Sequence, residues 1–457
     1  MTSPTTPAPT SDQDRAPAAE GLRKVLGLPA AVMFGLAYMM PLASFTTYGV
    51  VNTMTEGHVV TSYWITLVAM LFTAASYAAM AGAYSATGGA YTYTRRTLGG
   101  HVGFLGGWTI LLDYVLLPMM AYLVIGVYLH QSFPAVPQGV WIAGSIALVT
   151  VLNMVGITML SKVSSAIVLA QTVFLVLFAL LAVRTARGQE IPSLWDALAG
   201  RGPGTATALA GAAILCYSFL GFDSVASLAE ETRNARRTIP RAILLVTLLG
   251  GLLFIAVSLV SSLAFPHWQN YTSVDAASLD VVRAVGGKLF ESFFTAAFVA
   301  GCFGAVLAQQ ATVSRVLFSM GRDGVLPRRV FGYLHPVWRT PVYATLVVSA
   351  IGLVSLLVDL TLASSLINFG ALTAFSLVNI ATVKHYVIDG KRRGAGPILR
   401  YLVAPVIGLA LCVWLWTSLS EQAFVIGLCW LGAGLVYLVA MTRGFRVAPP
   451  DLDMTEA

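Results

Sequence analysis

The sequence predicts an all-α integral membrane protein with twelve transmembrane helices. Residues counted as hydrophobic make up 57% of the 457 positions and charged residues only 10%, against roughly 25% charged residues in soluble domains. Windows of about twenty apolar residues, enough to cross a hydrocarbon core of roughly 30 Å, can be placed twelve times along the chain. Lys and Arg are also distributed very unevenly between the two sides of these windows. Most of this chain is therefore expected to be embedded in lipid.

The first five predicted spans are separated by short polar or charged segments. Arg23 and Lys24 precede the first span, and Arg95 with Arg96 separates the second from the third. Lys162 separates the fourth span from the fifth. On this basis the spans are 28–54, 61–86, 101–131, 138–156 and 163–184.

The next seven spans follow the same pattern. Four arginines between positions 233 and 241 separate the sixth span from the seventh, and a basic segment at 322–339 separates the eighth from the ninth. Near Asp359 the ninth and tenth spans abut with almost no loop. These spans are 208–230, 239–264, 288–318, 341–358, 361–384, 400–418 and 422–442.

The two ends of the chain lack apolar runs. Residues 1–21, rich in Pro, Thr and Ala, predict a disordered cytoplasmic tail and not the apolar core of a cleaved signal peptide. Residues 443–457 form a second cytoplasmic tail, and 22–442 form the transmembrane domain. Of the 27 Lys and Arg residues, 22 fall on the side of the membrane that holds the N-terminus. Positive residues favour the inside, so a multi-pass protein of the cell membrane with both termini in the cytoplasm is predicted.

Two of the spans contain residues that weaken helices. Pro41 lies in the middle of the first span, where it removes a backbone donor, and Gly221 lies beside Asp223 in the sixth. Five spans separate the two interruptions, so two five-helix halves would have opposite orientations. This layout is typical of transporters whose broken helices meet at the bilayer midplane. The alternative is that both residues merely kink continuous helices, which membrane proteins tolerate.

Ionisable groups inside the spans are few, and each invites a functional explanation. Asp113 lies deep in the third span and Asp223 in the weakened part of the sixth, and no neighbouring span supplies a basic partner for Asp113. Carboxylates in a membrane cavity can attract a cation and carry a proton. Glu230, near the cytoplasmic end of the sixth span, either faces this pathway or lies at the surface. Glu291 and Asp359 are near span ends and are expected to be hydrated.

Aromatic side chains at the same depth are candidates for the walls of a site for an ammonium group, through apolar or cation–π contacts. The alternative is ordinary packing between membrane helices. These residues are Tyr38, Tyr114, Tyr217, Phe219 and Phe222.

Other functional classes find no support in the sequence. A phosphate-binding loop with a following Lys and an HExxH motif are both missing, and the six His are scattered, so no enzyme, metal site or nucleic-acid partner is expected. The four Cys lie in apolar stretches and are interpreted as small core residues. The segment Gly88–Tyr91 is interpreted as a turn or close packing between the second and third spans.

Residues 221–243 resemble the signature of the amino acid–polyamine–organocation transporters. That signature is a glycine and an acid in a broken sixth helix, followed by a charged loop in which Ala235 here replaces the usual Pro. The motifs at 88–91 and 314–327 also match, and those at 101–119, 218–223 and 331–341 resemble the putrescine importer branch. The resemblance implies a LeuT-type fold with two inverted repeats, about 22–200 and 201–395, and extra helices at about 396–442. It implies a substrate held between helices 1 and 6, with walls from helices 3 and 8.

One departure from the wider family concerns the substrate. Amino-acid members carry a Gly-Ser-Gly-like stretch in helix 1, whose backbone N–H groups hold the substrate carboxylate. This chain has Met40-Pro41-Leu42 there. Proline has no N–H and leucine blocks close approach, so the substrate is expected to be cationic and to lack a carboxylate. Some relatives also place a coupling Lys in helix 5, where this chain has Gln171.

Together these features predict a secondary active transporter that imports a small organic amine such as putrescine by proton symport and alternating access. The proton is the coupling ion, its gradient drives uptake, and no other cofactor is expected. The expected partners are the small cationic substrate and membrane lipid. One alternative is an amino-acid symporter or exchanger of the same fold, and another is a transport-inactive sensor or subunit. The candidate proton carriers are Asp113, Asp223 and Glu230. The predicted substrate contacts are Tyr38, Met39, Asp113, Tyr114, Tyr217, Phe219, Asp223 and Gln309, and the predicted helix breaks are Pro41 and Gly221.

Overall fold

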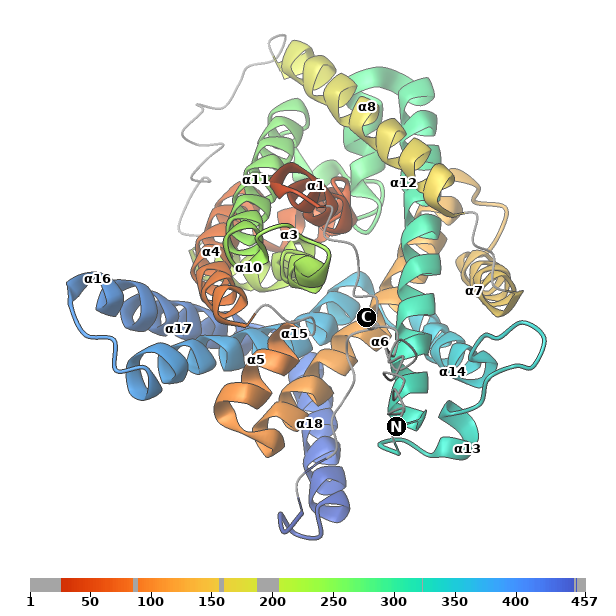
Figure 1. Cartoon of the computed structure of the whole chain (residues 1–457). Helices are drawn as coiled ribbons and strands as arrows, with labels where there is room; N and C mark the ends of the chain where they lie inside the picture. The colour runs from red at the N-terminus through yellow and green to blue at the C-terminus, as the bar shows by residue number, and fades with distance from the viewer. Residues whose placement is uncertain are drawn as a thin grey trace, which may run out of the picture.

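A computed structural model describes residues 26–84, 89–155, 160–186, 205–322, 324–447 and 449. Within these ranges the regular elements are all helices, and a single isolated β-bridge joins Leu26 to Thr232. The predicted all-α class is therefore confirmed (Figure 1).

The first half of the chain forms a series of helices that follow the predicted spans, with one additional helix between the second and third spans. The first span is divided into three pieces, so the chain changes direction inside it. The helices are α1 (Leu28–Tyr38), α2 (Ala43–Thr46), α3 (Tyr48–Met54), α4 (Val59–Ala83), α5 (Gly89–Leu98), α6 (Gly100–Ser132), α7 (Gln138–Val155) and α8 (Leu160–Ala186).

The second half contains a divided helix of the same kind. The sixth predicted span comprises α10 and a 3₁₀ segment, η1, with a short gap between them. The elements are α10 (Thr205–Phe219), η1 (Asp223–Glu230), α11 (Ala235–Ala264), η2 (Trp268–Asn270), α12 (Ala277–Arg322), α13 (Arg328–Phe331), α14 (Val342–Gly352), η3 (Leu353–Leu356) and α15 (Leu360–Val383).

The C-terminal part begins with a π-helical continuation of α15 and ends in two apolar helices. Its elements are η4 (Lys384–Asp389), α16 (Ala395–Ile398), η5 (Leu399–Val403), α17 (Ala404–Thr417) and α18 (Glu421–Met441). Across the described residues, ten helical segments are long and apolar enough to cross a membrane. Two shorter apolar helices, Leu169–Thr185 and Val342–Leu356, occupy the predicted fifth and ninth spans.

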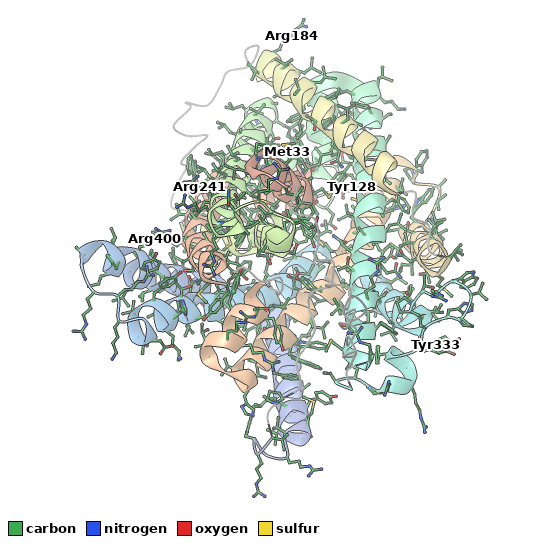
Figure 2. All side chains as sticks on the ribbon, in the orientation of Figure 1. Met33, Tyr128, Arg184, Arg241, Tyr333 and Arg400 are labelled. Carbon is green, nitrogen blue, oxygen red and sulfur yellow. The ribbon has the colours of Figure 1, made fainter. Side chains whose placement is uncertain are left out.

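The helices differ greatly in how much of their surface is covered by protein. The apolar window of α6 is 83% buried, and α6 packs against α12 and α15 in the interior. Tyr128 of α6, labelled in Figure 2, is fully buried, and its hydroxyl donates to the Phe45 carbonyl oxygen at 2.8 Å. The corresponding windows of α17 and α18 are only 22% and 17% buried, and these helices project from the bundle in Figure 1. Their exposed apolar faces are suited to contact lipid.

A pair of tryptophans attaches α18 to α6. The Nε1 of Trp108 donates to the Trp430 carbonyl oxygen, and the Nε1 of Trp430 donates to the Trp108 carbonyl oxygen, both at 2.9 Å. The two indoles stack with their centroids 4.8 Å apart. A Cβ on Gly434 would come within 2.3 Å of Trp108, so this glycine makes room for the pair.

Three sequence interpretations need correction. Of the two interpretations of Gly88–Tyr91, the turn is wrong for Gly89, which begins helix α5 packed against α6, and Gly88 lies outside the described residues. Glu291 is only 8% exposed instead of hydrated. The chain bends inside α12 at Gly287, which has a φ of 73°, and Arg283, on the other side of this bend, donates from Nε and Nη2 to the Glu291 carboxylate at 2.5 and 2.9 Å. Cys429 is exposed on α18, whereas the other three cysteines are buried.

Candidate functional site

The interruption in the first span leaves few free backbone donors. Helix α1 ends at Tyr38, and Pro41 lies in the gap before α2. The N–H of Met39 donates to Gly35 at 2.9 Å, that of Met40 to Ala37 at 3.2 Å, and that of Ala43 back to Met40 at 2.7 Å. Met40 adopts a left-handed φ of 54°, which is strained for a residue with a side chain. Most backbone N–H groups here are therefore already hydrogen-bonded to carbonyl groups of the same chain.

The interruption in the sixth span lies directly against the first. Gly221 has a φ of 122°, which favours glycine, and a Cβ there would come within 2.7 Å of Tyr38 Cδ1 and 3.1 Å of the Met39 nitrogen. Close contact between the two gaps therefore depends on the absence of a side chain at this position.

A buried asparagine supports the half-helix that leads into this gap. Nδ2 of Asn368, on α15, donates to the carbonyl oxygens of Ala213 and Ile214 at 2.8 and 3.0 Å. Sequence reasoning missed this residue, because nothing in a single apolar helix shows which neighbour its polar side chain will reach.

Asp223 is the first residue of η1. Its Oδ1 accepts a hydrogen bond from the Gly221 N–H at 3.1 Å. The positive end of the half-helix dipole favours a negative charge at this place. Asp223 is half-buried and faces a cavity, so it can still meet a ligand.

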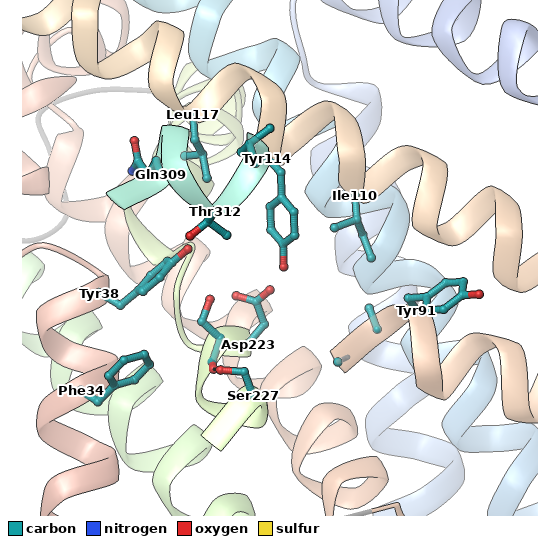
Figure 3. A pocket seen from close by; sticks show the side chains of 14 residues that line it. Phe34, Tyr38, Tyr91, Ile110, Tyr114, Leu117, Asp223, Ser227, Gln309 and Thr312 are labelled. Carbon is teal, nitrogen blue, oxygen red and sulfur yellow. Dashed lines mark hydrogen bonds between the residues drawn. The ribbon is translucent and has the colours of Figure 1, made fainter. Parts of the chain in front are cut away.

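The cavity beside Asp223 has a volume of about 210 Å³ and is lined by α1, α5, α6, η1 and α12. Figure 3 shows the phenol oxygen of Tyr114 pointing toward the Asp223 carboxylate, with Tyr38 and Thr312 on the opposite side. The hydroxyls of Tyr38 and Ser224 lie close to each other. Asp223 is the one carboxylate among the residues that line this cavity. We call this space the acidic cavity.

A second cavity of about 390 Å³ lies between α1, α2, α6, α8, α10 and α12, and no charged residue lines it. We call this space the amide cavity, after Gln171 and Gln309 in its wall. It shares with the acidic cavity the five lining residues Phe34, Tyr38, Leu117, Gln309 and Thr312.

Most of the predicted contact residues line one or both cavities. Tyr114 and Asp223 line the acidic cavity, Met39 and Tyr217 line the amide cavity, and Tyr38 and Gln309 line both. Pro41 and Gly221 lie in the gaps between helical segments and not in the cavity walls.

Two predicted contact residues lie outside both cavities. Phe219 is buried against Phe254, with ring centroids 5.6 Å apart. Asp113 is 6% exposed and lies where α6 meets α15, next to Gly370. Its Oδ1 has no hydrogen-bond partner among the described residues. The next residue on α6, Tyr114, lines the acidic cavity, so Asp113 lies behind the cavity wall.

Glu230, a predicted proton carrier, and Phe222, a predicted wall residue, line neither cavity as the structure describes them. Glu230 ends η1, and the placement of its side chain lies outside the described part of the chain. Phe222 is fully buried in an aromatic cluster with Tyr77 and Phe375, so it supports the break from behind.

Several wall residues were not predicted. Phe34 precedes Tyr38 by one turn, Ser227 follows Asp223 by one turn, and Thr312 follows Gln309 by three residues. Helical spacing from a residue already chosen would have found these three. Tyr91 lies in the Gly-Gly-Ala-Tyr motif, whose placement required the structure of α5.

Comparisons with known proteins agree over nearly the whole chain. The family described as "Amino acid permease" matches residues 30–436. The low-affinity putrescine importer PlaP of Escherichia coli (strain K12) is 36% identical over 447 residues, covering 94% of this chain and 96% of the importer. The branched-chain amino acid permease BcaP of Bacillus subtilis (strain 168) is 28% identical, covering 93% and 94% of the two chains. The methylthioribose transporter of the same organism is 25% identical, covering 92% and 94%.

Proposed function

This chain belongs to the amino acid permease family, and we propose that it is a secondary active transporter that imports a small organic amine such as putrescine. Its relatives are named as importers and permeases, and with its long apolar helices the chain is a multi-pass protein of the cell membrane and not an enzyme. The proposal concerns the substrate, the coupling ion and the way in which the cavities open to each side.

The observation that carries the proposed substrate class is the chemistry around the two breaks. Asp223 supplies a single carboxylate to the acidic cavity, and tyrosines surround it, which suits an ammonium group. Met39, Met40 and Ala43 donate their N–H groups within the chain, and Pro41 has none. A substrate carboxylate would find few partners here, whereas a protonated amine would find Asp223. The name of the Escherichia coli relative supports the same class of substrate.

We propose that a proton accompanies the amine. Asp113 is buried behind the wall of the acidic cavity, Asp223 lines that cavity, and no basic side chain lines either cavity. Two negative charges in a dry interior are unfavourable, and either a bound cation or a proton relieves this cost. In the proposed cycle, Asp223 binds the amine while Asp113 holds or releases the proton behind the wall. Glu230, at the end of η1, remains a second candidate for the proton route.

The proposed transport cycle is alternating access around the two broken helices of a LeuT-type fold with twelve transmembrane helices. Both breaks meet at Gly221, which supports movement of α1 and η1 as a unit. The backbone bridge between Leu26 and Thr232 ties the ends of the same two elements together, with the Leu26 N–H donating to Glu231 at 3.0 Å and the Arg233 N–H donating to Leu26 at 2.9 Å. The proposed orientation keeps both termini in the cytoplasm, as the distribution of Lys and Arg predicts.

Uptake of labelled putrescine into proteoliposomes, with and without an inward proton gradient, tests this proposal. Unlabelled lysine, ornithine or γ-aminobutyric acid serves as competitor. The proposal predicts uptake that the gradient stimulates and that γ-aminobutyric acid leaves unchanged. Strong competition by a carboxylated compound would instead favour an amino-acid transporter, as the 28% identical branched-chain permease suggests.

A further inference from the structure

The turn between α15 and α17 concentrates positive charge. Five basic residues and one acidic residue lie between positions 384 and 400. The acidic residue, Asp389, is already paired, because its carboxylate accepts from the Lys384 Nζ at 2.9 Å. The other four basic side chains are exposed, and they belong to Lys391, Arg392, Arg393 and Arg400. The turn therefore presents four cations that its own acidic residue does not neutralise.

Two tyrosines hold Arg392 and Arg400 near each other. Tyr386 and Tyr401 stack with their ring centroids 4.0 Å apart, and the Tyr386 hydroxyl is anchored to α4 by donating to the Ala79 carbonyl oxygen at 2.8 Å. The guanidinium carbon of Arg392 lies 5.1 Å from the Tyr386 centroid and 5.7 Å from the Tyr401 centroid. That of Arg400 lies 5.3 Å from the same Tyr401 centroid. Two like charges beside one ring repel each other, and an anion between them would remove this repulsion.

The backbone of the turn also fixes the place of Arg392. The Gly390 N–H donates to the His385 carbonyl oxygen at 3.0 Å, and the Arg392 N–H donates to the Tyr386 carbonyl oxygen at 3.1 Å. A hollow of about 400 Å³ lies beside this turn and leaves room for a phosphate group. Its walls are His385, Tyr386, Asp389, Gly390 and Arg392. Asp389 is the one anion in these walls, and its pairing with Lys384 reduces its repulsion of a phosphate.

Exposed aliphatic side chains continue directly from the basic turn along the next helix. The apolar window of Ala395–Thr417 is only 22% buried, and α16 and α17 project from the bundle (Figure 1). The exposed aliphatic residues are Ile398, Leu399, Val403, Val406 and Ile407. A phospholipid matches this arrangement, with its phosphate at the turn and its acyl chains along the helix. A free phosphate or a soluble acidic peptide would leave the apolar side unused.

From these observations we propose that the turn binds the phosphate group of an anionic phospholipid of the surrounding membrane, with Arg392 and Arg400 as its main contacts. A planar guanidinium donates two parallel hydrogen bonds to a phosphate, which a lysine cannot do. The distribution of Lys and Arg predicts that this turn lies on the cytoplasmic side, where basic clusters next to membrane helices bind anionic headgroups. This lipid binding does not depend on the proposed amine transport.

Binding of phosphatidylglycerol, labelled on an acyl chain, to the purified full-length protein in a neutral detergent tests the proposal. The competitors are unlabelled phosphatidylglycerol, phosphatidylcholine and inorganic phosphate. Phosphatidylglycerol should compete at least tenfold better than phosphatidylcholine, which has the same phosphate but no net charge. Inorganic phosphate should compete far more weakly, because it makes no contact with the apolar helix. Equal competition by the two lipids, or by inorganic phosphate at the same concentration, would reject an anionic-lipid site.

Two variants test the named residues in the same assay, with thermal unfolding as the check on folding. Arg392→Gln with Arg400→Gln should weaken phosphatidylglycerol binding at least tenfold. The matched control, Arg443→Gln with Arg446→Gln, removes two exposed arginines after α18 and should change the affinity less than twofold. Tyr401→Leu keeps every charge but removes the shared ring, and should weaken binding at least threefold.

Three results would overturn the proposal. They are an affinity within twofold of the wild type in the Arg392→Gln, Arg400→Gln variant, the same result in folded Tyr401→Leu, and an equal loss in the control. Both arginines are exposed, so their double variant is expected to fold even if Tyr401→Leu does not. The assay uses no transported substrate, so its outcome is separate from that of the proposed function.

Discussion

Replacement of Gly221 by alanine tests the contact between the two broken helices. Gly221 has a φ of 122°, a conformation that residues with a side chain rarely adopt. The added methyl group would also come within 2.7 Å of Tyr38 Cδ1 and 3.1 Å of the Met39 nitrogen. Both effects act on the wall that the acidic and amide cavities share.

The size of the effect follows from the backbone strain. A residue forced into a sparsely populated φ/ψ region costs about 1–3 kcal/mol. The chain can relieve this strain and the steric contact only by separating the two breaks, which enlarges the distance between Asp223 and Tyr38. If the bound state must restore that contact, the affinity for the amine falls roughly 5- to 150-fold, since about 1.4 kcal/mol corresponds to a factor of ten.

The assay combines equilibrium binding of labelled putrescine to purified protein with thermal unfolding of the same samples. Gly99→Ala is the control, because Gly99 has a φ of 96° with nothing within 4 Å of its Cβ position and lies away from both cavities. Both variants should lose thermal stability, but only Gly221→Ala should lose affinity. Gly221→Ala with an affinity within twofold of the wild type, or an equal loss in Gly99→Ala, would refute the reasoning.

Two further predictions concern residues outside the cavity walls. Asp113→Asn should change putrescine affinity less than threefold but remove the stimulation of uptake by an inward proton gradient; stimulation that persists in this variant would exclude Asp113 as the proton carrier. Trp430→Phe removes the hydrogen bond to the Trp108 carbonyl oxygen and should lower the stability by about 1 kcal/mol in a thermal unfolding assay, with uptake per folded molecule unchanged. Trp414→Phe is its control, because Trp414 is 47% exposed on α17, and an equal loss there would show that the indole pair adds nothing.

The helical content was predictable because hydrocarbon imposes a simple rule on the sequence. A segment that crosses the membrane must satisfy its backbone groups internally and present apolar side chains, so long apolar windows indicate helices. Asp359 marked the end of the ninth span, and in the structure its carboxylate caps α15 by accepting from the Leu362 N–H at 2.7 Å. Such local signals need no knowledge of the neighbouring helices.

The orientation of individual side chains was not predictable from the same rule. Helix α6 is apolar on all sides, so its sequence has no polar stripe that shows which face meets a cavity. Tyr114 faces the acidic cavity, whereas its neighbour Asp113 faces α15. Phe219 likewise packs against Phe254, although it lies two residues from the break. These directions depend on the packing of neighbouring helices.

The central claim is that Asp223 binds an ammonium group of a substrate without a carboxylate. Equilibrium binding of labelled putrescine to the wild type and to Asp223→Asn tests it most directly, because asparagine keeps an oxygen that can accept from the Gly221 N–H but carries no charge. We predict nearly unchanged thermal stability, at least a tenfold loss of putrescine affinity, and no competition by γ-aminobutyric acid in the wild type. Full putrescine affinity in the stable Asp223→Asn variant would contradict the claim.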